Sequence, residues 1–107
     1  MSTASIGRAT EHRVSRLLQT QGWSQIMRAA ASKGSADLLM SHPVHGGALL
    51  QVGRASKRLG PADRDRLVTD AESIGALALL AVFIPREGVT LWQVTRGKPA
   101  EWARWVS

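Results

Sequence analysis

The sequence predicts an α/β domain with a central mixed sheet flanked by helices. Apolar residues at helical spacing indicate two helices, one over 4–21 and one from Pro61 to about Ile74. Short apolar runs indicate strands over 23–30, 36–41, 48–53, 76–84 and 89–94. The run 76–84 is almost wholly apolar, as expected of a central strand covered on both faces. The order is therefore α-β-β-β-α-β-β, and the strands flanking the second helix are expected to be parallel neighbours.

The first helix carries a carboxylate on its apolar stripe. Glu11 precedes Val14 by three residues and Leu18 by seven, so we expect it to face inward, and Gly22 ends the helix. A carboxylate on a buried face is costly unless it is paired or bound to a metal. Glu11 is therefore a candidate ligand, with an ion pair to Arg28 as the alternative. The stripe consists of Ile6, Val14, Leu17 and Leu18.

The second and third strands place two more polar groups where the pattern predicts apolar ones. Asp37 opens the second strand, and the Gly46-Gly47 pair indicates the hairpin to the third. Gln51 interrupts the apolar third strand, where Leu49, Gln51 and Gly53 share one face and Ala48, Leu50 and Val52 the other. If Glu11, Asp37 and Gln51 converge, they indicate a site. The alternatives are a strand-end cap for Asp37 and a hydrogen-bonded core amide for Gln51.

The second helix and the aromatic residues have structural interpretations. Pro61 suits a first helical turn, Gly75 ends the helix, and its stripe consists of Leu67, Val68, Ala71 and Ile74. Trp23 and Trp92 are expected in the core. A short helix in the tail 99–107 is expected to hold Trp102 and Trp105, which could stack on bases, dock the tail or pack in a dimer. His42 and His45 are expected to be solvated turn residues, and His12 an exposed helix residue.

Length and composition limit the function classes. The chain has 107 residues, which suits one domain over 1–107, and its hydrophobic content of 44% is enough for a core. It contains no cysteine, which excludes disulfides and cysteine metal sites. No apolar run is long enough for a membrane helix, and the N-terminus lacks a signal-peptide pattern. We therefore expect a cytoplasmic protein without a membrane partner.

The charge favours a polyanionic partner. The net charge is +6 and the pI about 11.4, so binding to nucleic acid would release counterions. Residues 61–107 are balanced, with six basic and six acidic groups. All of the excess lies in 1–60, where Glu11 and Asp37 are the acidic residues. The basic residues there are Arg8, Arg13, Arg16, Arg28, Lys33, Arg54, Lys57 and Arg58.

These elements and residues resemble the PD-(D/E)xK nuclease superfamily, and within it the archaeal-type Holliday junction resolvases and their short actinobacterial and phage relatives. The similarity covers about residues 6–95. Its motifs are short, so the resemblance depends on their occurring in the family's order and on the expected elements. The matching stretches are Gly7-Arg8-Ala9-Thr10-Glu11-His12-Arg13-Val14, Gly22-Trp23, Arg28, Ser32-Lys33-Gly34-Ser35-Ala36-Asp37-Leu38, Leu50-Gln51-Val52-Gly53 and the helix from Pro61.

The resemblance implies a restriction-endonuclease-like αβββαβ(β) core and a homodimeric, structure-selective endonuclease that acts in DNA recombination and repair. Its Mg²⁺ (or Mn²⁺) would be held by Asp37, Glu11, Gln51 and the Val52 carbonyl, as oxygen ligands suit a hard ion. We expect Arg28 and Ser32 to contact phosphate. The remaining basic residues of the expected DNA-facing surface are Arg8, Arg13, Lys33, Arg54, Lys57 and Arg58.

The sequence departs from this family at Gly53. The pattern has lysine there, which stabilises the transition state, and loss of one such donor typically costs about 10²–10³ in rate. Lys57 could return from the following loop as a catalytic residue, whereas Arg54 is adjacent but points to the other face. Three functions therefore stay open: an endonuclease for four-way junctions, a catalytically degenerate module that binds junction DNA, and an interaction domain for an acidic protein.

Overall fold

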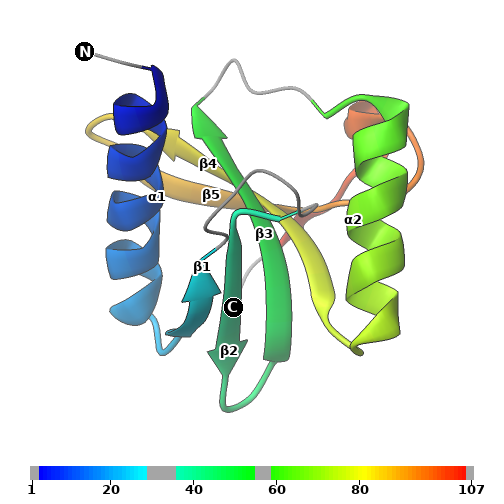
Figure 1. Ribbon diagram of the computed structural model, residues 1–107, viewed down its shortest axis with the longest axis horizontal. Helices are drawn as coiled ribbons and strands as arrows, with labels where there is room; N and C mark the ends of the chain where they lie inside the picture. Colours follow the sequence, from blue (N-terminus) through cyan, green and yellow to red (C-terminus); the bar gives the residue numbers. More distant parts are fainter. Residues whose placement is uncertain (1–2, 29–35, 55–58, 106–107) are drawn as a thin grey trace.

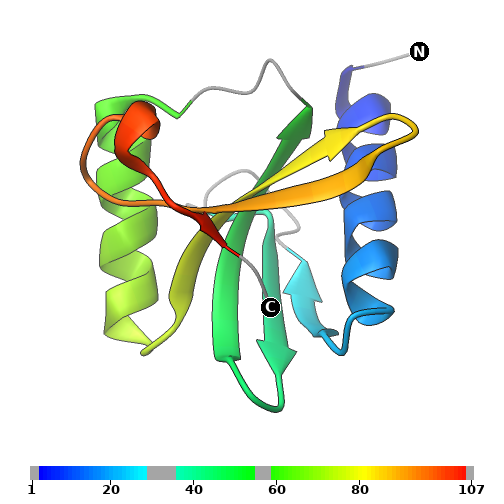
Figure 2. The same cartoon turned by 180° about the vertical axis from the view of Figure 1, so that it is seen from behind.

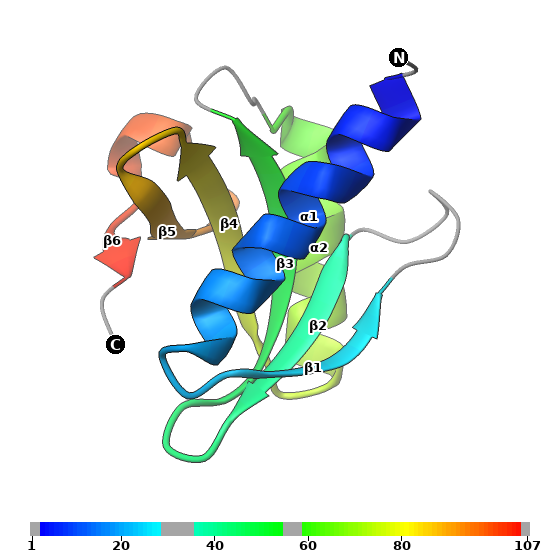
Figure 3. The same ribbon diagram turned by 90° about the vertical axis from the view of Figure 1, so that its left-hand side faces the viewer.

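Two helices sandwich a six-stranded sheet. In the computed structural model, which describes residues 3–28, 36–54 and 59–105 and only the backbone of 3–8, 28 and 54, α1 (Thr3–Gln19) covers one face and α2 (Pro61–Ser73) the other (Figures 1 and 3). No helix in these ranges has the length and apolar character needed to cross a bilayer. The strands are β1 (Ser24–Arg28), β2 (Leu38–His42), β3 (Gly46–Arg54), β4 (Leu77–Ile84), β5 (Gly88–Gln93) and β6 (Arg104–Trp105).

The strands follow one another across the sheet in chain order, and β3 pairs with β4 in parallel while the other neighbours are antiparallel. The predicted α/β class, the mixed sheet and the order α-β-β-β-α-β-β are confirmed. The predicted helix in the tail is wrong. Only the 3₁₀ turn η1 (Pro99–Glu101) forms in the described part of the tail, and β6 then pairs with β5 (Figure 2).

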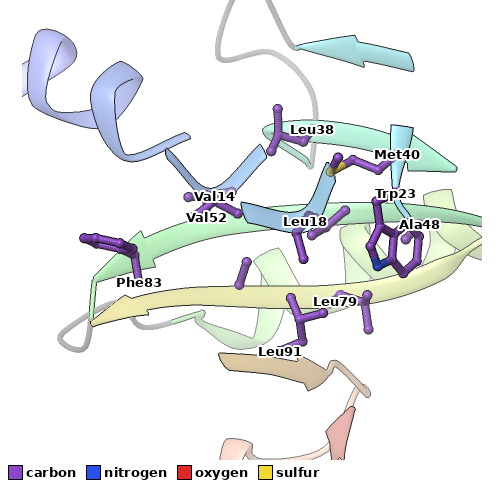
Figure 4. Close-up of a cluster of buried hydrophobic side chains, with 12 residues drawn as sticks. Val14, Leu18, Trp23, Leu38, Met40, Ala48, Val52, Leu79, Phe83 and Leu91 are labelled. Atoms are coloured by element: carbon purple, nitrogen blue, oxygen red, sulfur yellow. The ribbon is translucent and has the colours of Figure 1, made fainter. Parts of the chain in front are cut away.

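The two sheet faces form two separate clusters of buried side chains. Val14 and Leu18 of α1 lie in one cluster with Val52 of β3 and Leu79 of β4 (Figure 4), to which Leu50 of β3 also belongs. Residues of the alternate positions, among them Leu49, pack on the other face with Leu67 and Ala71 of α2. The predicted alternation along β3 is therefore confirmed, because successive strand residues point to opposite faces.

Two members of the predicted stripes lie outside the core. Leu17 is 36% exposed, and Ile74, which follows the last turn of α2, is 56% exposed. Leu17 turns away because the buried face of α1 is narrow and passes through Thr10, Val14, Ser15 and Leu18.

An aromatic cluster, consisting of Trp23, His42, His45 and Trp105, replaces the predicted solvated turn. The His42 and His45 rings lie 4.4 Å apart between centroids, and His45 meets Trp105 at 4.7 Å. The Nδ1 atom of His42 accepts hydrogen bonds from the N–H groups of Val44 (3.0 Å) and His45 (3.4 Å). The prediction that these histidines are merely solvated is therefore wrong, since they organise the β2–β3 turn against the core.

Arg96 ties the segment after β5 to α2. Its guanidinium donates to Asp65 and Glu72, both at 2.8 Å, and to Thr69 at 2.9 Å. The hydrogen bond to Asp65, followed by that to Glu72, raises the pKa of Arg96 above its ordinary value. The three partners lie along one side of α2, so this contact fixes the position of the helix more than it adds stability.

Leu18→Ala is expected to lower the free energy of unfolding by about 2–5 kcal/mol, because Leu18 is 1% exposed and its removal leaves a cavity against the sheet. Leu17→Ala, one residue earlier on the same helix, is the matched control and should cost much less. Urea denaturation followed by tryptophan fluorescence measures both. Equal losses for the two variants would contradict the burial of Leu18 and the exposure of Leu17.

Candidate functional site

Asp37 is held at the point where β2 begins. Its own N–H donates to the Leu50 carbonyl at 2.8 Å, and its Oδ2 accepts from the Val52 N–H at 2.8 Å. The regular pairing of β2 with β3 begins at Leu38 and Leu50, and the bond from the Asp37 N–H to the Leu50 carbonyl departs from that register, so Asp37 lies in an irregular position beside Leu50 and Val52. The carboxylate is therefore fixed beside the main chain of β3, and its Oδ1 takes no part in this bond.

The neighbouring groups of β3 point in different directions. The N–H and C=O groups of one strand residue point to the same neighbouring strand, so the Val52 carbonyl lies on the side of β3 that Asp37 occupies. Gln51 lies on the face that α2 covers, as Leu49 does, and its side chain is partly exposed. An amide oxygen, a carbonyl and a carboxylate thus come from adjacent positions of two strands.

Glu11 lies on the helix that covers the opposite face. It is partly exposed, so the prediction that it faces fully inward is wrong: it lies at the edge of the buried stripe, between Thr10 and Val14. The Val14 side chain packs over the end of β3 beside Val52 (Figure 4). Glu11 is therefore at the end of the sheet where Asp37 lies. Glu11 and Gln51 each already interact with another group of the protein.

Positive residues gather at this end. Arg28 is in register with Leu38 at the start of β2, Arg54 follows Gly53 at the end of β3, and Arg8 lies in the first half of α1. Arg13 is exposed, with its guanidinium carbon 5.8 Å from the centre of the Phe83 ring. The predicted phosphate contact Ser32 and three residues of the predicted DNA-facing surface, Lys33, Lys57 and Arg58, lie outside the described residues.

The donor set suits a divalent ion but carries a low charge. Within residues 3–28, 36–54 and 59–105, no three histidine or acidic side chains lie together as metal ligands. The predicted set has two carboxylates, Glu11 and Asp37, and neutral oxygens from Gln51 and Val52. Oxygen ligands of this kind fit Mg²⁺ or Mn²⁺.

Arg64 is a buried cation at this end of α2 that the sequence pattern conceals. It is 9% exposed, and its Nη1 donates to the Leu59 carbonyl at 3.1 Å. The alternating run Asp63-Arg64-Asp65-Arg66 is typical of a solvated helix face. The signal that places it inward is its spacing, because it precedes Leu67 by three residues and Ala71 by seven.

The fold is that of a known resolvase. The chain is similar to the 1.6 Å structure of Hjc from Archaeoglobus fulgidus, a Holliday junction resolvase from an archaeal hyperthermophile, with a TM-score of 0.66 and 21% identity. The match covers 80% of this chain and 75% of that one. The predicted restriction-endonuclease-like fold is confirmed. No protein-family model matches the sequence, and no curated protein is significantly similar to it.

Asp37→Asn is expected to weaken Mn²⁺ binding severely and to preserve the fold. Asparagine keeps an oxygen that accepts from the Val52 N–H but removes the charge at the centre of the donor set. Calorimetric titration with Mn²⁺ measures the loss. Glu87→Gln, which removes a carboxylate from the exposed turn before β5, is the charge-matched control. Unchanged Mn²⁺ affinity in Asp37→Asn would exclude Asp37 as a ligand.

Gln51→Glu is expected to strengthen Mn²⁺ binding by at least about tenfold. A unit charge at ligand distance from the ion contributes several kcal/mol even at an effective dielectric constant of about 20, and tenfold requires about 1.4 kcal/mol. The same titration measures the gain. An affinity that stays the same or falls would show that residue 51 does not face the ion.

Proposed function

We propose that this chain is a metal-dependent endonuclease that cuts branched DNA, of the Holliday junction resolvase type. The observation that carries the proposal is Asp37, whose carboxylate is fixed beside Val52 at the end of the sheet where Arg13 is exposed and the backbones of Arg8, Arg28 and Arg54 lie. Hjc, with which the chain shares its fold, is described as a Holliday junction resolvase.

The proposed site holds Mg²⁺ or Mn²⁺ through Asp37, Glu11, Gln51 and the Val52 carbonyl. The ion, when bound, neutralises charge on the phosphate and activates water for attack on phosphorus. The Val52 N–H orients Asp37 through Oδ2, and the proposal assigns Oδ1, which takes no part in that bond, to the ion. This bond keeps the carboxylate in place without the ion, which lowers the reorganisation needed when substrate binds.

The proposed DNA-binding surface is the basic end of the molecule. Arg13 is exposed beside Phe83, and the backbones of Arg8, Arg28 and Arg54 lie at the same end. Cations that neutralise phosphates release counterions, so binding should weaken steeply with salt. Ser32, Lys33, Lys57 and Arg58 belong to this proposal on the sequence resemblance.

The proposal includes a homodimer. A four-way junction presents equivalent strands in pairs, so a two-fold dimer would place one copy of the site against each strand of a pair. One site acts on one strand at a time, so simultaneous cuts in a pair of equivalent strands need two copies.

The second candidate is a non-catalytic module that binds junction DNA. The observation that favours it is Gly53, since β3 offers no cation on the face that carries Gln51. The two candidates share the binding surface and differ in whether product forms.

A labelled four-way junction with Mg²⁺ is expected to yield nicked or paired-cut products that EDTA abolishes. Asp37→Asn should lower single-turnover cleavage at least about 10³-fold, while Glu87→Gln should cleave as the parent protein does.

Salt-sensitive junction binding without product would leave the second candidate in place of the first. A protein that neither binds nor cuts junction DNA at physiological salt would refute both, and would favour a protein partner for the basic surface.

A further inference from the structure

We propose that Arg64 is a phosphate-binding residue of this site and supplies, from α2, the positive charge that Gly53 does not supply from β3. The inference rests on the proposed nuclease or junction-binding function. It begins from a side chain whose burial is otherwise unexplained.

Arg64 is under-satisfied for a buried cation. Its side chain is 9% exposed, and Nη1 donates to the Leu59 carbonyl at 3.1 Å. Its Nε is buried and has no hydrogen-bond partner in the described part of the chain. Guanidinium groups buried in this way are costly unless they meet an anion, and their fork geometry matches phosphate oxygens.

The packing of α2 places Arg64 level with Gly53. Ala71 of α2 and Ala78 of β4 belong to the same buried cluster, at the end of the molecule where the chain turns from α2 into β4. Arg64 precedes Ala71 by seven residues, about 10 Å along the helix. Along β4 the same distance corresponds to three to four residues, so the residue about 10 Å beyond Ala78 on the same face is Val82. Val82 is in register with Gly53.

Gly53 carries no side chain on this face. Gln51 and Gly53 share the face that α2 covers, and a glycine presents no side chain between the helix and the end of β3. Figure 1 shows the first turn of α2 and the end of β3 at the same end of the molecule. A phosphate bound by Asp37 and its ion would therefore meet the guanidinium from the α2 side.

A double-substitution cycle tests the charge. Arg64→Gln removes the charge and keeps a donor that can serve the Leu59 carbonyl, and Arg64→Lys keeps the charge. Gly53→Lys adds a cation on β3, where residue 53 does not have a positive φ. Arg66→Met is the matched control, because Arg66 lies on the same helix with its side chain 68% exposed. Lys57→Met tests the alternative donor.

Arg64→Gln is expected to lower single-turnover junction cleavage about 10²–10³-fold and to reduce the slope of log binding constant against log salt, measured in EDTA, by about one. Arg64→Lys should stay within about tenfold of the parent rate. Gly53→Lys should restore cleavage to the Arg64→Gln protein while adding little to the parent. Arg66→Met should change neither rate nor slope.

The outcomes separate the inference from the proposed function. If the parent cleaves and Arg64→Gln cleaves equally well, or if only Lys57→Met is defective, the inference is wrong and the nuclease stands. Arg64→Gln could instead lose activity only because the fold is less stable. Urea denaturation would then show a lower free energy of unfolding, Arg64→Lys would also lose activity, and Gly53→Lys would not restore cleavage. That set of results also overturns the inference. If the parent protein binds junction DNA without cleaving it, the salt dependence of binding tests the inference. A slope that Arg64→Gln reduces by about one supports the inference, and an unchanged slope overturns it. A parent that neither binds nor cleaves refutes the proposed function, and the inference falls with it.

Discussion

The hydrogen bond from the Val52 N–H to the Asp37 carboxylate is the contact on which the geometry of the candidate site depends. β3 continues for four residues beyond Leu50, whereas β2 starts at Leu38, so the main chain of β3 needs other partners there. Asp37 supplies one of them with its side chain. Because this bond satisfies an N–H group of β3, the carboxylate is held in the plane of the sheet, where groups from both faces can reach it.

The parallel pairing of β3 and β4 explains why the first turn of α2 lies near the end of β3. A parallel connection requires the chain to return along the sheet, and α2 makes this return. Its first turn must therefore lie near the end of β3, which is also the end that carries Asp37. Pro61 begins the helix there, and Arg64 falls within its first turns on the buried side. The topology thus brings a residue that is distant from Asp37 in sequence to the same end of the fold.

Local sequence patterns were sufficient to predict the elements and the buried faces that depend on residue spacing. The apolar run of β4 and the alternation around Gln51 were sufficient to predict the element order and the two faces of β3, because burial follows strand periodicity. His42 was misjudged because its environment is made by Trp23, which is remote in sequence. Trp105 packs on the same Trp23, in agreement with the expected docking of the tail. Arg64 escaped notice for a related reason: its charge matches a solvated face, and only the position of α2 against the sheet shows that it is buried.

The oxygen-bearing residues of the candidate site could be predicted from the sequence, but the position of the positive side chain that accompanies them could not. Glu11, Asp37 and Gln51 departed from the apolar pattern, whereas the cation to accompany them was sought on β3 or just after it. A guanidinium stays protonated throughout the physiological range, unlike a buried lysine, whose pKa shifts readily. If Arg64 serves the phosphate, it contributes charge and hydrogen bonds, and the proton released by the attacking water must pass to a carboxylate or to solvent. The exchange of a strand lysine for a helix arginine would then alter the pH dependence of the reaction as well as its rate.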